Sequence, residues 1–426
     1  MNGSLRKVAI VGGSRIPFCR SNTFYADKSN LDMLTASLDA LADRFGLQGK
    51  QPDEVMAGAV ITHSKDFNLA NEAVLSSSLS NLTVGITLQQ ACGTSLQAAL
   101  NLAAKIATGQ IDCGIAAGTD TTSDAPIVFG KKFSSRLIRA SQARSMKQRL
   151  AAFKGFGPGE LKPVIPTNSE IRTGLSMGQH CERMAQEWEI ERSAQDQLAY
   201  DSHQKAAAAY DEGFFDDLVV NWDGVSRDNI LRPDTSLEKL ATLRTVFDKG
   251  PKATLSAGNS TTLSDGAAAV LLCSEDWAAQ HDLPVQAYLA TGRSASVDFV
   301  NDEGLLMAPT VAVAEMLQRA GLTLQDFDFY EIHEAFAAQV LCTLKAWESD
   351  DYCQQRLGLE KALGSIEREK MNVRGGSLAL GHPFAATGAR ILGTLAQLLE
   401  DKGKGRGLIS VCTAGGMGVS AILERP

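Results

Sequence analysis

The sequence predicts an α/β fold in which short buried strands alternate with helices. Apolar runs that end in glycine are separated by alanine-rich stretches with helical spacing. This alternation is typical of strand–helix–strand units with helices on both faces of a sheet. The predicted elements of the first third are a strand at 7–11, an amphipathic helix at 31–45, a strand at 55–60, a helix of small residues at 97–108 and a strand at 111–117.

A weak internal repeat indicates that the fold is duplicated. Residues 92–118 run in the order loop, helix, glycine, strand, glycine. Residues 381–416 repeat this order with the loop GHPFAATG, a helix at 389–399, a strand at 407–411 and the sequence AGG. The same order of elements near both ends of the chain predicts that each half builds a similar unit.

The region between the two copies differs in composition and is interpreted as an insertion. Residues 125–252 are charged, helical in pattern and poor in strand signal. We therefore expect an N-terminal half at 1–124, completed by residues 253–275, and a C-terminal half at 276–426. The insertion itself is expected to consist of loops and helices. A second, shorter helical insertion is expected at 346–369.

Composition and charge narrow the class of protein. The 426 residues are 44% hydrophobic and 21% charged, which is ordinary for a globular enzyme, and the formal net charge is −8. A net negative charge argues against a general nucleic-acid binder, since such binding depends on Lys and Arg contacts with phosphates. The eight cysteines include no C-x-x-C pair, so neither a disulfide framework nor a zinc site is expected.

Targeting and membrane-spanning signals are weak in this sequence. The N-terminal sequence MNGSLRKVAIVGG has only a four-residue apolar run before its glycines, which is too short for the core of a signal peptide. No stretch approaches the ~18 apolar residues expected of a membrane span. Together with the cysteine pattern, this predicts a soluble protein of a reducing compartment, the cytoplasm.

The first candidate for chemistry is Cys92, which lies directly before the small-residue helix. A cysteine at a helix N-terminus feels the positive end of the helix dipole, which lowers its pKa and favours the thiolate. Gly93 removes side-chain bulk where a substrate carbonyl would approach. A free cysteine in an alanine-rich stretch is also commonly a core residue, so this segment by itself leaves both interpretations open.

Three later segments carry further candidates. His333 lies between two carboxylates in EIHEAF, without the H-E-x-x-H spacing of a metal site. His382 lies in GGSLALGHP, where glycines allow close backbone approach and Pro383 fixes the entry into a helix. Cys412 ends a strand before TAGGMG, whose exposed N–H groups can form an anion hole. Taken singly, each is also explained as a solvated loop or a tight strand end.

Together the four segments occur in the order found in the thiolases, which the chain resembles over nearly its full length. Further similar segments are SMG at 176–178, SHQKAA at 202–207, LRTVFDK at 243–249, AGNS at 257–260 and DGAAA at 265–269. HEAF and GHPFAATGAR differ from the Asn- and Leu-Gly-containing segments of many thiolases. They resemble the thiolase subunits of trifunctional-type fatty-acid β-oxidation complexes. The CIGGG motif of the family is CTAGG here.

The resemblance implies a duplicated thiolase fold, with two βαβαβαββ-type halves in a layered α/β/α/β/α sandwich. It implies CoA-dependent cleavage of 3-ketoacyl-CoA to acetyl-CoA and a shortened acyl-CoA, which is a reversible Claisen condensation. Cys92 would be the acylated nucleophile, His382 its base, Cys412 the second acid and base, and His333 a partner of the enolate oxygen. The backbone N–H groups of Cys92 and Ala414 would form an anion hole.

For coenzyme A, the resemblance assigns Arg232 to the nucleotide end and Met177, Phe247, Thr261 and Phe336 to the pantetheine channel. Thr261 replaces a serine of the better-known pattern and keeps its hydroxyl. Coenzyme A is a substrate here, and neither a metal nor a redox cofactor is implied. Thiolases form tight dimers, often dimers of dimers. The trifunctional resemblance adds an α-type partner subunit with hydratase and hydroxyacyl-dehydrogenase activities.

Four alternatives are weighed against this interpretation. A biosynthetic acetoacetyl-CoA thiolase would use the same residues in the synthetic direction. A ketoacyl synthase shares the duplicated fold and a Cys/His site, but that family has no cysteine at the position of Cys412. A non-catalytic acyl-CoA or sterol carrier of this fold would not need all four candidate side chains. A nicotinamide-binding protein is excluded because no G-x-G-x-x-G follows the strand at 7–11.

One segment is not explained by the resemblance. Residues 131–154 contain eight basic residues and no acidic one. Apolar Ala143, Met146, Leu150 and Phe153 recur at helical spacing, which predicts that part of the segment forms a basic amphipathic helix. Three roles remain open: a solvated helix of the insertion, steering of anionic acyl-CoA, or docking on anionic lipid or a partner subunit.

Overall fold

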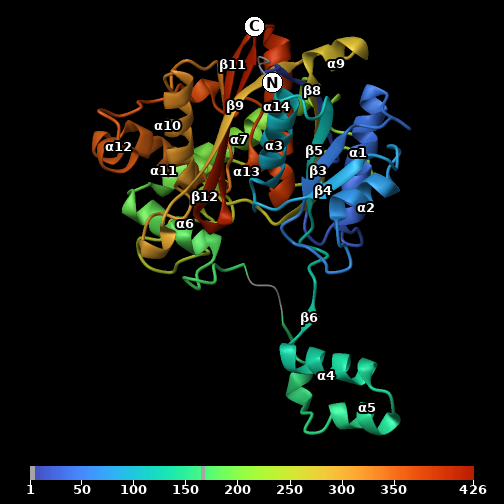
Figure 1. Ribbon diagram of the computed structural model, residues 1–426. Coiled ribbons are helices and arrows are strands. Elements are labelled where there is room, and N and C mark those ends of the chain that lie inside the picture. Colours follow the sequence, from blue (N-terminus) through green and yellow to red (C-terminus); the bar gives the residue numbers. More distant parts are fainter. Residues whose placement is uncertain (1–4, 165–167) are drawn as a thin grey trace.

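The computed structural model describes residues 5–164 and 168–426. Residues 1–4 of the expected N-terminal half and 165–167 of the expected insertion lie outside the described residues. Most of the described chain folds around a mixed sheet of ten strands with helices on both faces, and a two-helix extension leaves this body (Figure 1).

The N-terminal half of the sheet has the strand order β1–β8–β5–β3–β4. β3 pairs in parallel with β4 and β5, whereas β8 runs antiparallel to both of its neighbours, β1 and β5. These strands are β1 (Val8–Arg15), β3 (Glu54–Gly58), β4 (Val84–Thr87), β5 (Cys113–Asp120) and β8 (Ser264–Ser274), and the short β2 (Cys19–Arg20) pairs with β8.

The C-terminal half repeats this arrangement in the order β9–β12–β11–β10, with the same parallel and antiparallel relations. Its strands are β9 (Ala287–Ser296), β10 (Phe329–Ile332), β11 (Gly405–Thr413) and β12 (Met417–Arg425). The predicted duplication is therefore confirmed. Within the described residues, a single bridge between Tyr330 and Met371 stands where β4 has its counterpart, so this half departs from the βαβαβαββ pattern at its third strand.

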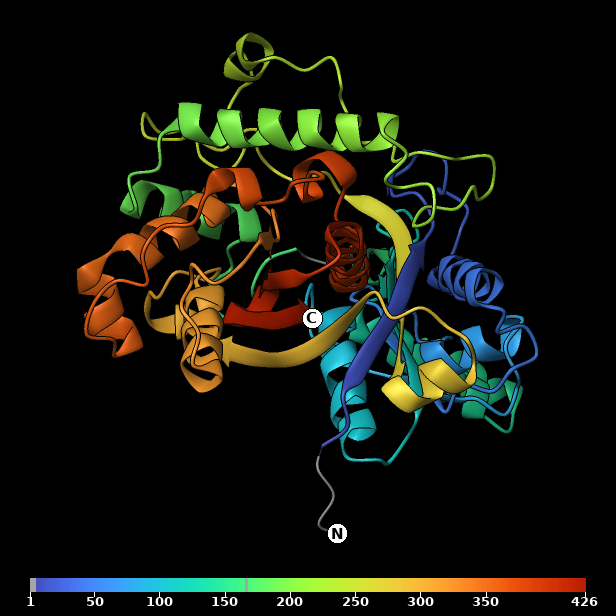
Figure 2. The same cartoon turned by 90° about the horizontal axis from the view of Figure 1, so that it is seen from above.

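The two halves of the sheet enclose a central helical layer formed by α3 (Thr94–Ala107) and α14 (Thr387–Lys402), as Figure 2 shows. Successive residues of a strand face opposite layers: in β8, Leu272 packs toward the central helices, whereas Leu271 packs toward α1. The outer helices are α1 (Asn30–Phe45) and α2 (Leu69–Ser76) on the first half, and α10 (Ala308–Ala320) and α11 (Ala337–Glu348) on the second. The expected α/β/α/β/α sandwich is confirmed.

Small residues let the two central helices approach each other closely. A Cβ atom added at Gly388 would lie only 2.5 Å from the backbone nitrogen of Leu96. The Ser95 hydroxyl donates to the carbonyl of Ala385 (2.5 Å) and accepts from the N–H of Ala389 (2.8 Å). The N-termini of α3 and α14 are thereby joined, together with the candidate segments that precede them.

The predicted elements are present, with small shifts of their ends. The strand predicted at 7–11 continues to Arg15, because it pairs with β8 along that length after a register shift at Gly12. α1 begins with a reciprocal cap between Ser29 and Asp32 and ends at Gly46, whose φ of 64° is left-handed. Other helices are α9 (Glu275–Gln280), α12 (Asp350–Leu357) and α13 (Ser377–Leu380).

The region expected to be an insertion has two structurally distinct parts. α6 (Met177–Glu187), α7 (Arg192–Asp211) and α8 (Leu237–Ala241) belong to the body, where α6 and α7 pack on α11. Residues 128–164, called the arm below, extend away from it (Figure 1). The arm consists of β6 (Val128–Phe129), α4 (Lys131–Gln142), α5 (Met146–Ala152) and β7 (Pro163–Val164), with β6 paired to β7.

The amphipathic helix predicted within 131–154 is only partly right. The backbone is extended at Ala143 (ψ 132°), which ends α4, and Ser145 then caps the separate helix α5. Ala143 therefore shares no helical face with Met146 and Leu150. No residue of α4 or α5 is buried. Across residues 5–164 and 168–426, every helix is too short or too polar to cross a membrane.

We expect Gly118→Ala to destabilise the protein. An added Cβ at Gly118, near the end of β5, would lie 2.0 Å from the carbonyl oxygen of Ala385, so the backbone before α14 must move. Overpacking of this kind typically lowers the free energy of unfolding by about 1–3 kcal/mol. Thermal and urea unfolding of the two proteins measure the loss.

Gly157→Ala is the matched control, because a Cβ at Gly157 meets no atom within 4 Å and the residue has a negative φ of −119°. Its stability should equal that of the wild type. Equal stability of Gly118→Ala and wild type would show that β5 and the segment before α14 are not in firm contact.

Candidate active site

Three of the four candidate side chains line one cavity of about 310 Å³ between the two halves of the fold. Cys92 Sγ lies 3.2 Å from His382 Nε2, and Cys412 shares the same wall. His333 does not line the cavity. Its side chain is fully buried beside His382, with 4.2 Å between the two ring centroids. The fold thus gathers four residues that are up to 320 positions apart in the sequence.

Cys92 sits in a strained turn immediately before α3. Ala91 has a φ of 47°, a left-handed conformation that costs free energy for a residue other than glycine. Gly93 is the N-cap of α3, and a Cβ there would lie 2.7 Å from the side chain of Val419. The turn holds the thiol at the cavity wall while the backbone passes tightly under β12.

The expected lowering of the Cys92 pKa is wrong. Burial raises the pKa of the Cys92 thiol to about 12, because a thiolate in the cavity wall loses its hydration. The backbone N–H groups of Ala414 and of Cys92 itself act in the opposite direction, but more weakly. The helix N-terminus is present as predicted, and desolvation outweighs the favourable interactions there. Cys92 therefore rests as a neutral thiol near pH 7.

His382 is also neutral at rest. Burial, together with the positive charge of Arg390, lowers the pKa of His382 to about 3. Its Nδ1 lies 2.6 Å from the hydroxyl of Thr387, while Nε2 faces Cys92. If Nδ1–H donates to Thr387, the Nε2 lone pair is free to accept a proton from the thiol. The His382 ring is thus oriented so that Nε2 can act as the base toward Cys92.

Cys412 is the penultimate residue of β11, two residues before the turn at Ala414–Gly416. Burial raises the pKa of Cys412 well above its ordinary value, and the neighbouring Cys92 adds to this effect. Ala414 lines the cavity and directs its N–H toward Cys92, whereas the N–H of Gly415 donates to Glu170 (2.7 Å). The two sulfur atoms share a site in which each rests as a thiol.

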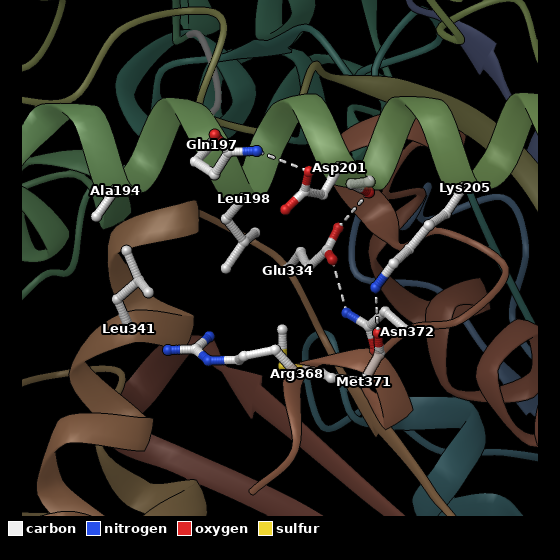
Figure 3. Close-up of a pocket in the computed structure, with 11 residues that line it drawn as sticks. Ala194, Gln197, Leu198, Asp201, Lys205, Glu334, Leu341, Arg368, Met371 and Asn372 are labelled. Atoms are coloured by element: carbon white, nitrogen blue, oxygen red, sulfur yellow. Dashed lines mark hydrogen bonds between the residues drawn. The ribbon is translucent and has the colours of Figure 1, made fainter. Parts of the chain in front are cut away.

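Glu334, the residue after His333, fixes the loop that follows β10. Its carboxylate accepts hydrogen bonds from Asn372 Nδ2 (2.6 Å) and from the hydroxyl of Ser202 (2.7 Å). Figure 3 shows Glu334 and Asn372 at the edge of a second cavity of about 260 Å³, next to α7. Asn372 also donates to the carbonyl of Ile332, so Glu334 serves the backbone around His333 rather than the catalytic cavity.

Four of the five residues expected to contact coenzyme A line the cavity, namely Met177, Phe247, Thr261 and Phe336. The rings of Phe247 and Phe336 pack edge to face with 5.7 Å between centroids, and Thr261 donates to the carbonyl of Ala335 (3.0 Å). The fifth, Arg232, is exposed outside this cavity, where its guanidinium donates to the carbonyl of Asn229 (3.0 Å).

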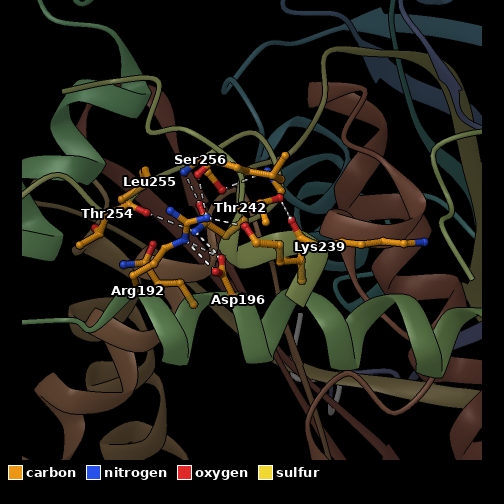
Figure 4. A network of polar contacts seen from close by, with 12 residues as sticks. Arg192, Asp196, Lys239, Thr242, Thr254, Leu255 and Ser256 are labelled. Atoms are coloured by element: carbon orange, nitrogen blue, oxygen red, sulfur yellow. Dashed lines mark hydrogen bonds and ion pairs between the residues drawn. The ribbon is translucent and has the colours of Figure 1, made fainter. Parts of the chain in front are cut away.

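A polar network holds the loop between α8 and β8 that carries Thr261. Arg192 donates to Asp196 on α7 (2.8 Å), and Asn259 Nδ2 donates to the same carboxylate (3.0 Å). Glu182 on α6 accepts from the hydroxyl and N–H of Thr254 (Figure 4 shows Arg192, Asp196 and Thr254). These contacts fix the wall of the cavity that carries Thr261 to the helices α6 and α7 of the insertion.

Several residues of the site were not found from the sequence. The cavity is also lined by Asn168, Leu263, Leu306 and Phe384, and two hydroxyls outside it, those of Ser377 and Thr387, contact the candidate histidines. Thr387 follows His382 within one motif, so its proximity was a usable signal. Ser377 lies 44 residues from His333, and no local pattern pairs them. In the described part of the chain, no cluster of three or more His, Cys, Asp or Glu side chains is arranged to hold a metal ion.

Comparison with known proteins agrees with this geometry. Residues 8–276 match the family model described as "Thiolase, N-terminal domain", and residues 285–425 match "Thiolase, C-terminal domain". A 3-ketoacyl-CoA thiolase of Vibrio cholerae is 39% identical over 426 residues, covering 98% of this chain and 97% of the relative. A 3-ketoacyl-CoA thiolase of Yersinia pestis is 39% identical over 424 residues, with the same coverage.

Solved structures give the same result. The acetyl-CoA acetyltransferase of Bacillus anthracis superposes with a TM-score of 0.82 at 27% identity, covering 99% of both chains. The human mitochondrial 3-ketoacyl-CoA thiolase in complex with CoA superposes with a TM-score of 0.81 at 26% identity, covering 99% of this chain and 98% of that one. From the two domain matches, the full-length relatives and the shared fold, the chain belongs to the thiolase family.

Proposed function

We propose that the protein cleaves 3-ketoacyl-CoA with coenzyme A, giving acetyl-CoA and an acyl-CoA shortened by two carbons. The observation that carries this proposal is the 3.2 Å contact between Cys92 Sγ and His382 Nε2 in a cavity that also contains Cys412. A nucleophilic thiol, its base and a second thiol acid are the groups that carbon–carbon bond cleavage of a 3-ketothioester needs. The reverse condensation, as in a biosynthetic acetoacetyl-CoA thiolase, uses the same groups.

In the first half-reaction, Cys92 Sγ attacks the ketone carbon while its proton passes to His382 Nε2. The bond between C2 and C3 then breaks, and its electron pair becomes the enolate of acetyl-CoA. Cys412 gives its proton to C2, so acetyl-CoA leaves and the acyl group stays on Cys92. His333 donates a hydrogen bond to the enolate oxygen, directly or through water, from its buried place beside His382.

In the second half-reaction, the Cys412 thiolate takes the proton of a new CoA thiol. The CoA sulfur attacks the acyl group on Cys92, and the shortened acyl-CoA leaves as Cys92 recovers its proton from His382. The N–H groups of Cys92 and Ala414 hold the oxygen of this tetrahedral intermediate. Removing one donor of such an anion hole typically costs about 10²–10³ in rate.

Coenzyme A enters along the wall formed by Met177, Phe247, Thr261 and Phe336. The aromatic and thioether side chains supply apolar contact for the pantetheine arm, and Arg232, exposed outside the cavity, supplies positive charge for the nucleotide phosphates. No metal or redox group takes part in these steps, because proton transfer and thioester exchange need neither. Met177, Arg232 and Phe247 belong to the insertion at 125–252, which therefore acts as the CoA-binding domain. The N-terminal half consists of residues 1–124 and 253–275, and the C-terminal half of residues 276–426.

The other candidate functions account for less of the site. A ketoacyl synthase would not use Cys412, which faces the same cavity as Cys92. A non-catalytic acyl-CoA or sterol carrier has no need of a base within 3.2 Å of a cavity thiol. Release of acetyl-CoA from 3-ketoacyl-CoA by the purified protein tests the proposal, and failure of release over a series of chain lengths would exclude it.

We further propose a role in fatty-acid β-oxidation in the cytoplasm, as a dimer or dimer of dimers. All eight cysteines are free, which suits a reducing compartment. The HEAF and GHPFAATGAR segments support an α-type partner subunit with hydratase and hydroxyacyl-dehydrogenase activities. Sedimentation velocity of the protein alone measures its oligomeric state, and sedimentation with an added α-type subunit measures whether the two form a complex.

The arm is proposed to dock on a surface of anionic lipid. Besides the eight basic residues of its segment 131–154, it exposes large apolar side chains: Ile138 is 55% exposed, Met146 66% and Leu150 71%. Basic and apolar side chains together suit a lipid interface, where each basic residue adds about 1 kcal/mol near the surface. A solvated helix pair, or steering of acyl-CoA toward the cavity, explains the charge but not the exposed apolar residues.

Alkylation of Cys92 by iodoacetamide in the free enzyme should rise about tenfold per pH unit from pH 6 to pH 9. Burial raises the Cys92 pKa to about 12 and lowers that of His382 to about 3, so no thiolate–imidazolium pair forms at rest. The thiolate fraction then grows with pH throughout this range. Mass spectrometry of the Cys92 peptide follows the rate, and a plateau near neutral pH would reveal a preformed ion pair.

Cys412→Ser should block cleavage but leave Cys92 able to accept an acetyl group from acetyl-CoA. General acid–base catalysis typically contributes about 10²–10⁴-fold, so release of acetyl-CoA from 3-ketoacyl-CoA should fall at least that far. Peptide mass spectrometry after a short pulse of acetyl-CoA locates the acetyl group. Cys353→Ser, a buried cysteine outside the cavity, is the control. Label mainly on Cys412 in the wild type, or normal α-proton exchange in Cys412→Ser, contradicts these roles.

Reversing the charges of Arg139, Arg144 and Lys147 to Glu should abolish co-sedimentation with anionic vesicles while turnover of a short, soluble substrate stays unchanged. The matched control reverses three exposed basic residues of the body, Lys65, Arg319 and Lys361. Steering would instead lower kcat/KM with little change in kcat, and this deficit would shrink as salt rises. If neither property changes, the arm is a solvated helix pair and the docking proposal fails.

A further inference from the structure

His333 is part of a buried chain of side chains that continues away from the catalytic cavity. Its Nδ1 lies 3.0 Å from the hydroxyl of Ser377, which in turn accepts from Arg390 Nη2 at 2.9 Å. The carboxyl group of Glu331 lies 3.8 Å from Arg390 Nη1, and burial raises the pKa of Glu331 to about 8. His333 Nε2 is buried and has no protein partner among the described residues.

The direction of these hydrogen bonds follows from the number of protons available. A guanidinium only donates, so the Arg390 N–H must point at the oxygen of Ser377. The hydroxyl has one proton of its own, and His333 Nδ1 is its one other partner in the described part of the chain. If Nδ1 also carried a proton, three protons would meet at one oxygen and the buried serine proton would lack an acceptor.

We infer that Ser377 and Arg390 are positioning residues that hold His333 in the tautomer with its proton on Nε2. The serine proton then lies on the line to Nδ1, and the Nε2–H is left as a donor for the substrate oxygen. This inference rests on the proposed function, in which an enolate oxygen forms beside His382. It explains why His333, which has two neutral tautomers, presents an N–H donor at Nε2 rather than a lone pair.

Burial, with a smaller contribution from Arg390, also keeps the histidine from becoming a cation. Burial lowers the pKa of His333 well below its ordinary value, and the positive charge of Arg390 adds to the effect, as it does for His382. A doubly protonated ring could not accept from Ser377. Charge and hydrogen-bond direction therefore select the same neutral form.

The neighbouring His382 shows why this selection matters. Its Nδ1 lies 2.6 Å from the Thr387 hydroxyl, to which no other donor is directed among the described residues, so this contact permits either tautomer. His382 can thus carry its proton on Nδ1 and use Nε2 as a base toward Cys92. In the proposed mechanism the two rings, with 4.2 Å between their centroids, work in opposite tautomers, and at Ser377 an arginine fixes the direction of the hydrogen bond.

The inference is tested first by a double-mutant cycle with His333→Asn, whose amide N–H₂ donates whatever Ser377 does. Ser377→Ala should lower kcat for cleavage roughly 10- to 100-fold in the wild-type background, which is less than the loss of a whole anion-hole donor, about 10²–10³-fold. In the His333→Asn background, the same change should cost less than about twofold, since no tautomer remains to be selected. Acetylation of Cys92 and KM should change little in either background.

The second readout is independent of activity. In ¹⁵N-histidine spectra of the full chain, the signal missing from His333→Asn reports this ring, which we expect protonated at Nε2 in the wild type. Ser377→Ala should shift it toward the other tautomer, whereas Ser410→Ala should not, because the buried Ser410 hydroxyl has no protein partner in the described part of the chain. A wild-type ring protonated at Nδ1, or an equal loss in both backgrounds of the cycle, overturns the inference, while absent acetyl-CoA release with the expected tautomer overturns only the proposed function.

Discussion

The contact between the N-termini of the two central helices is the constraint on which the site depends. Ser95 at the start of α3 bonds to both Ala385 and Ala389 at the start of α14, and small residues on both helices permit the approach. Cys92 and His382 each lie a few residues before these helices, one from each half of the duplicated fold. Their 3.2 Å separation therefore follows from the way the two halves pack.

The same packing removes much of the hydration of these side chains, and this desolvation decides the electrostatics of the site. Desolvation raises the pKa of the thiols Cys92 and Cys412 and lowers that of the imidazoles His333 and His382. Each of the four groups is neutral at rest. Charge therefore develops in the site only while bonds between the protein and the substrate are forming. In such an environment a few fixed N–H donors stabilise the developing oxyanions strongly, since little water competes with them.

Hydrogen-bonded polar side chains outside this neutral centre hold the surrounding segments in place. Glu334 with Asn372 secures the backbone next to His333, the Arg192–Asp196 pair secures the channel wall, and Arg390 orients the hydroxyl behind His333. The arm stands apart from all of these, with basic and apolar side chains exposed on α4 and α5. The proposed catalysis and the proposed attachment to a surface thus belong to separate parts of the fold.

The sequence alone determined the strand–helix alternation, the duplication and the four candidate segments, because each is written in local spacing and in motifs of small residues around Cys92, His333, His382 and Cys412. Only the tertiary structure decided what depends on distant neighbours. The third strand of the second half shrinks to a bridge at Met371, the pKa of Cys92 rises instead of falling, and Ser377 meets a histidine 44 residues away. Desolvation and hydrogen-bond direction are properties of the packed interior, and no local pattern in the chain encodes them.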